Sequence, residues 1–63
     1  MDAEIWWDVL DSEKGWKLEK NILTGHCRIL DPGKVRTAWG RESKMRAAFE
    51  KVKRQLNPAH TPQ

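Results

Sequence analysis

The sequence predicts an α+β fold: a three- or four-stranded antiparallel β-sheet (meander) followed by one C-terminal amphipathic α-helix packed on one face. Three observations predict this class. Short runs rich in β-branched and aromatic residues fill the first two thirds of the chain. Residues typical of turns separate these runs. In the last third the apolar residues recur at helical spacing instead.

The first predicted strand, residues 4–10 (EIWWDVL), has two adjacent tryptophans. Neighbouring strand residues point to opposite faces of a sheet, so one ring must leave the core. Ile5, Trp7 and Val9 form a wholly apolar side, and we expect the helix to cover it. Trp6 is then expected on the open face.

Three further segments complete the predicted hairpin and the third strand. Residues 11–15 (DSEKG) predict a five-residue loop, and residues 16–20 (WKLEK) alternate as a second strand. Residues 26–30 (HCRIL) predict a third strand. The segment 21–25 either extends the second strand or turns the chain, which leaves both three and four strands open.

The clearest predicted turn is Asp31–Lys34 (DPGK). Proline fixes φ at the second turn position, and Gly33 is expected to take the positive φ at the third. Residues 35–39 (VRTAW) follow as the last predicted strand. The sheet is therefore expected to end shortly before the helix begins.

The helix is predicted over residues 42–56, with a hydrophobic stripe along one side. The stripe consists of Met45, Ala48, Phe49, Val52 and Leu56. Asn57 precedes a proline, which disfavours the helical conformation, so the helix should end there. We expect residues 1–57 to form one compact domain and residues 58–63 to be a flexible tail.

Composition argues against several functional classes. The 63 residues include one cysteine, Cys27, so no disulfide can form within the chain, and no ligand spacing indicates a metal or a cofactor. Cys27 and His26 are adjacent and would point apart on a strand, and no catalytic motif is present. We therefore expect a non-enzymatic protein without catalytic residues. The acidic start and the absence of a long apolar run predict a cytoplasmic protein without membrane contact.

The charge distribution indicates nucleic-acid binding. Residues 1–32 carry seven acids and four bases, whereas residues 33–63 carry two acids and eight bases. Such an asymmetry favours a polyanionic partner, most directly DNA bound through segment 34–54. The bases of a single strand could stack on Trp6 or Trp16, or the sheet could enter the major groove of a duplex. The predicted binding residues are Lys34, Arg36, Arg41, Lys44, Arg46, Lys51, Lys53 and Arg54.

The alternative is a protein–protein interaction module. Trp6, Leu10 and Trp16 would then form a hydrophobic contact surface on the sheet, for a partner protein or for a homodimer. Acidic residues of the first hairpin would repel phosphates, which favours this alternative. A chain of this size could serve as an inhibitor or accessory factor, encoded for example by a phage or plasmid.

Overall fold

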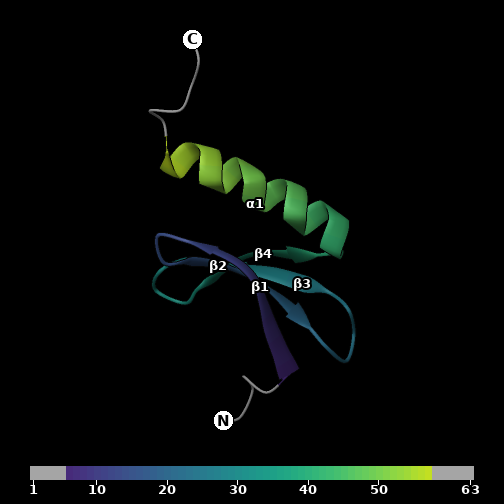
Figure 1. Ribbon diagram of the computed structural model, residues 1–63. Coiled ribbons are helices and arrows are strands. Elements are labelled where there is room, and N and C mark those ends of the chain that lie inside the picture. Colours follow the sequence, from purple (N-terminus) through teal and green to yellow (C-terminus); the bar gives the residue numbers. More distant parts are fainter. Residues whose placement is uncertain (1–5, 58–63) are drawn as a thin grey trace.

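The computed structural model describes residues 6–57, which form a four-stranded antiparallel sheet and one helix (Figure 1). The elements are β1 (Trp7–Glu13), β2 (Trp16–Asn21), β3 (Cys27–Leu30), β4 (Arg36–Gly40) and α1 (Glu42–Leu56). Each strand pairs with the next along the chain, so the sheet is a meander with β1 and β4 at its edges. The predicted α+β class is confirmed, and the segment 21–25 separates two strands. The predicted tail, residues 58–63, lies outside the described residues.

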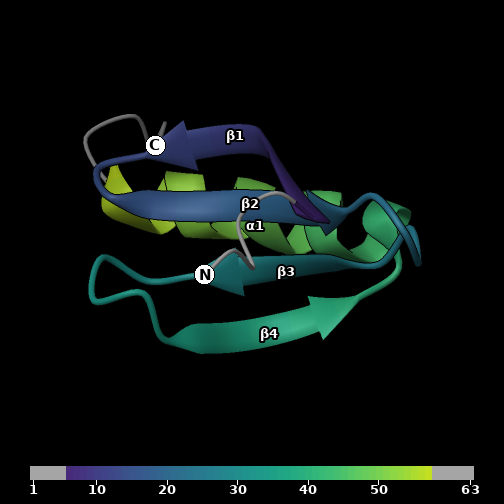
Figure 2. The same cartoon turned by 90° about the horizontal axis from the view of Figure 1, so that it is seen from below.

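Helix α1 covers one face of the sheet and leaves the other face open. Figure 2 looks onto the open side, with the helix behind β2 and β3. The core between helix and sheet is a cluster in which no member is more than 5% exposed. Its members are Leu18, Cys27, Ile29, Met45 and Phe49. Strand alternation explains the open side: the neighbours of these core residues in β2 and β3 must point away from the helix.

The prediction that Trp7 and Val9 lie under the helix is wrong. Val9 pairs with Glu19 rather than with the core residue Leu18, and directly paired residues share a face of the sheet. The cause is a β-bulge between Val9 and Asp11, which inserts Leu10 as an unpaired residue on the helix side. Trp7 and Val9 therefore lie on the open face. Ile5, the third member of the predicted side, lies outside the described residues.

The β1–β2 hairpin closes with a tighter turn than the sequence predicted. The strands pair up to Glu13 and Trp16, so Lys14 and Gly15 alone form the loop, and the predicted five-residue loop is wrong. Both loop residues have positive φ, 49° and 89°. This conformation suits a two-residue hairpin because its twist matches that of the strands.

The turn between β3 and β4 lies where it was predicted. The Lys34 N–H donates to the Asp31 carbonyl at 2.8 Å, and the Asp31 carboxylate accepts from the N–H groups of Gly33 and Val35 at 2.9 Å. The left-handed residue is Lys34, with φ 68°, and not Gly33 as predicted. The Asp31 side chain therefore fixes a turn in which lysine takes the strained position.

The hairpin also fixes the C-terminal end of α1. Lys53 Nζ donates to Asp11 Oδ2 at 2.8 Å, and Lys14 Nζ donates to the Leu56 carbonyl at 3.0 Å. The second bond satisfies one of the carbonyl groups that a helix end leaves without an internal partner. A cation at this end also interacts favourably with the helix dipole. Asp11 faces the helix because it pairs with the core residue Leu18.

Candidate functional site

The open face of the sheet combines aromatic and basic side chains. Strand register and alternation place residues of all four strands on this side. We call the following residues the open face: Trp7, Val9, Lys17, Glu19, Arg28, Leu30, Arg36 and Trp39. They come from both halves of the sequence, so the surface exists only in the folded sheet.

Three side chains form the fixed centre of this face. The Arg28 guanidinium lies 3.7 Å from the centroid of the Trp7 ring, in a cation–π contact. Its Nε and Nη2 atoms lie 2.9 and 2.8 Å from Glu19 Oε1. Glu19 is only 9% exposed, and Arg28 neutralises its charge at short range. The three side chains therefore hold one another in place, and the Glu19 carboxylate presents little negative charge to a ligand.

Trp39 and Val9 mark the two sides of the open face. Trp39 is 57% exposed and Val9 is 53% exposed. The His26 ring meets the Trp39 ring edge-on, with centroids 5.8 Å apart, and the Arg36 guanidinium lies 5.7 Å from the Trp39 centroid. More than half of the Trp39 side chain is in contact with water, and a ligand that covered the ring would remove this apolar area from water.

The acidic residues of β1 lie on the helix side and not on the open face. Asp8 pairs with Lys20 and Glu13 pairs with Trp16, and both partners are on the helix side. Asp11 reaches across to Lys53 of α1. The expectation that these acids would repel phosphates from the hairpin is therefore wrong for the open face. Within the four strands, Glu19 is the one carboxylate that lies there.

The predicted basic segment 34–54 is divided among separate surfaces. Arg36 lies on the open face, and Lys34 lies in the β3–β4 turn. Arg41 is exposed at the start of α1. The outer side of α1, opposite to the open face, carries the exposed residues Lys44, Lys51 and Arg54. No single ligand face contains all eight predicted bases.

Two of the predicted bases serve the fold. Arg46 Nε bonds Glu42 at 2.8 Å, and Lys53 bonds both Asp11 and Glu50. The hydrogen bond from Lys53 lowers the pKa of the Asp11 carboxyl, and the same bond raises the pKa of Lys53. Hydrogen bonds from Arg46 and Lys20 likewise lower the pKa of Glu42. These charges are already matched, so they are poor candidates for phosphate contacts.

Two of the three alternative interface residues do not lie on the open face. Leu10 and Trp16 pack against the core cluster on the helix side, whereas Trp6 precedes β1 and is 42% exposed. Sequence reasoning missed Trp39, Trp7 and Arg28 as site residues. The alternation of β2 around Leu18 was the available signal, because it fixes which residues of the neighbouring strands face away from the helix.

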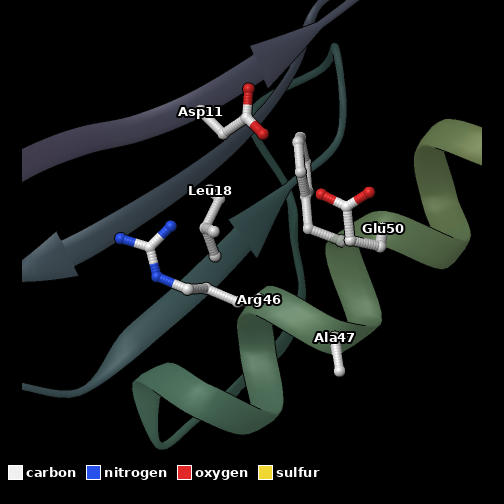
Figure 3. Close-up of a pocket in the computed structure, with 6 residues that line it drawn as sticks. Asp11, Leu18, Arg46, Ala47 and Glu50 are labelled. Carbon is white, nitrogen blue, oxygen red and sulfur yellow. The ribbon is translucent and has the colours of Figure 1, made fainter.

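A shallow hollow of about 200 Å³ lies on the other side of the sheet, between β1, β2 and α1 (Figure 3). Asp11, Leu18 and Arg46 line it, and the two charged groups already have ion-pair partners.

Among the described residues, no three His, Cys, Asp or Glu side chains gather as metal ligands. Burial raises the pKa of the Cys27 thiol, which makes it unreactive.

Comparison with known proteins adds no functional assignment. No protein-family model, no curated protein and no solved structure matches the chain. Among residues 6–57, no helix has the length and apolar character needed to cross a membrane.

Proposed function

We propose that this protein is a small, non-enzymatic nucleic-acid-binding domain and that the open face is its binding surface. The observation that carries the proposal is the separation of charge by the sheet. Lys17, Arg28 and Arg36 lie on the open face with the one neutralised carboxylate of Glu19, whereas the acids of β1 lie on the helix side. Basic side chains beside an exposed indole are the features that nucleic-acid backbones and bases recognise.

The proposal relocates the site expected from the sequence. Of segment 34–54, Arg36 belongs to the binding surface, and Lys17 and Arg28 join it from the first half of the chain. The basic outer side of α1 is then a solvated surface that contributes to solubility. A cytoplasmic location, where nucleic acid is accessible, belongs to the same proposal, and the single unpaired thiol of Cys27 is in keeping with a reducing compartment.

Two matched charge reversals test which surface binds. Lys17→Glu with Arg36→Glu changes the open face, and Lys44→Glu with Lys51→Glu changes the outer side of α1. Both pairs alter the net charge equally and all four side chains are exposed, so the general attraction to a polyanion falls equally. Binding to labelled mixed-sequence DNA is measured by fluorescence anisotropy at low salt.

We expect the open-face variant to bind about 10- to 100-fold more weakly, since two charged contacts are lost. The helix variant should lose only a few-fold. For the unaltered protein, phosphate contacts at Lys17 and Arg36 predict a slope of about −1.4 to −1.8 when log affinity is plotted against log salt, because Arg28 is engaged with Glu19. A larger loss in the helix variant would contradict the proposed surface. No binding at low salt, together with a dimer mass by light scattering, would favour the protein–protein alternative.

A further inference from the structure

We infer that the open face binds a single, unpaired strand of nucleic acid, with one base stacked on the ring of Trp39 and backbone phosphates beside Arg36 and Lys17. This inference rests on the proposed function and names the class of ligand for the same surface. It follows from the exposure of the Trp39 ring, the width of the sheet and the small number of basic side chains on the open face.

Trp39 is the side chain best placed to stack on a base. It is 57% exposed on the edge strand β4, and the edge-on contact with His26 holds its ring. The Arg36 guanidinium lies over the Trp39 ring at 5.7 Å from its centroid, near the outer limit of a cation–π contact, so the phosphate of a base stacked on Trp39 would lie close to this guanidinium. Trp7 differs, because Arg28 covers its ring much more closely, at 3.7 Å. Trp39 is therefore the stacking residue, and Trp7 supports the platform.

The width of the sheet disfavours a duplex in the major groove. Four strands at about 4.8 Å spacing make a face about 14 Å wide before side chains are added. The major groove of B-DNA is about 12 Å wide and admits a helix or a two-stranded ribbon. A four-stranded face is wider than this groove and cannot enter it. A single strand, by contrast, can lie across such a face with its bases turned toward the protein.

The charge of the face is also too small for binding by phosphate contacts alone. The open face carries three basic side chains, Lys17, Arg28 and Arg36, and Arg28 is already engaged with Glu19. Proteins that rely on phosphate contacts to duplex DNA typically make about six to ten of them. Base stacking supplies the missing affinity, but only where the faces of the bases are not already covered by their neighbours in a duplex.

The test compares two labelled probes of equal length, about 16 nucleotides: an oligothymidylate and a blunt DNA duplex. Affinity is measured by anisotropy in one low-salt buffer, and the quenching of tryptophan emission is followed in the same titration. We expect the single strand to bind at least about tenfold more tightly than the duplex and to quench the emission. Equal or tighter binding of the duplex would overturn the inference and leave the proposed function standing. Binding of neither probe would overturn both.

Variants of the exposed tryptophans show whether Trp39 is the stacking residue. Trp39→Ala should weaken binding of the oligothymidylate by roughly 5- to 150-fold, and Trp39→Phe should retain most of the affinity. Trp6→Ala is the matched control, because Trp6 is also exposed, and it should leave the affinity unchanged. Circular dichroism verifies that each variant is folded. Unaltered affinity in Trp39→Ala, or an equal loss in Trp6→Ala, would overturn the assignment.

Discussion

The Arg28 guanidinium is held between the ring of Trp7, 3.7 Å away, and the carboxylate of Glu19, 2.8 Å away. The three residues come from three successive strands, β3, β1 and β2. They pack together, near the buried side chain of Leu30, on the side of the sheet that no helix covers. The same contacts neutralise the one carboxylate of the open face, so stability and the proposed binding surface depend on the same side chains.

Removing the guanidinium should destabilise the fold by about 2 to 3 kcal/mol. Arg28→Met keeps much of the packing on Trp7 but leaves Glu19 almost buried without a partner. Glu19→Gln in the same chain removes the unpaired charge and should restore more than half of the loss. Urea unfolding of both single variants and the double variant gives the interaction energy. Simple addition of the two single losses would show that the side chains do not interact.

Acid should destabilise the protein because it protonates two carboxyls that form ion pairs, Asp11 of β1 and Glu42 of α1. Lys53 lowers the pKa of Asp11, and Arg46 and Lys20 lower the pKa of Glu42. A carboxyl with a lower pKa in the folded chain binds protons more readily when unfolded. Its contribution is therefore present at neutral pH and is lost as the pH falls below about 4 and through the folded pKa. Thermal unfolding followed from neutral pH to about pH 2 should show a falling midpoint.

Two variants isolate the contribution of the Asp11–Lys53 pair to this effect. Asp11→Asn should reduce the drop in unfolding temperature between neutral and acidic pH. Asp8→Asn is the matched control, because this β1 carboxylate has no ion-pair partner within residues 6–57. Its pH dependence should follow that of the unaltered protein. Parallel curves for all three proteins would contradict the assigned role of Asp11.

The sequence predicted the helix better than the sheet because helical information is local. The stripe from Met45 to Leu56 repeats over about three turns, and a proline follows it in the sequence, so the predicted and observed bounds of the helix agree. Which residues of β1 face the helix depends on a bulge at Leu10, and only the pairing of β1 with β2 shows this bulge. Asp11, beside the bulge, bonds a lysine 42 residues later, and no local pattern reports such a contact.

The candidate site escaped prediction for the same reason. Trp7, Arg28 and Trp39 lie far apart in the sequence and meet only through the register of four strands. Counting charges showed that the second half of the chain is basic, but not which surface each basic side chain lies on. In the folded sheet and helix, one basic side chain of segment 34–54 lies on the open face, several lie on the outer side of α1, and two form ion pairs. Facing, rather than net charge, therefore determines the candidate surface.

Lys34→Gly should stabilise the fold by a few tenths to about 1 kcal/mol. Lys34 is exposed with φ 68°, a conformation that glycine adopts without steric strain. The greater freedom of glycine in the unfolded chain offsets part of the gain. Lys34→Ala is the control, because it removes the same charge and keeps the strain. Denaturant unfolding compares the variants, and equal stability of the glycine and alanine variants would show that charge rather than backbone strain controls this turn.

Gly15 and Gly25 offer a matched pair for the packing of the hairpin turn. Both have positive φ, 89° and 82°, so alanine is strained at either position and should cost about 1 kcal/mol. A Cβ at Gly15 would also lie 3.1 Å from Pro32 Cβ, whereas nothing lies within 4 Å of one at Gly25. Pro32 is part of the β3–β4 turn, so this contact joins the two loops at one end of the sheet. We expect Gly15→Ala to destabilise the protein by about 1 kcal/mol more than Gly25→Ala in urea unfolding. Equal losses would mean that backbone strain alone accounts for both substitutions and that the loops can separate without cost.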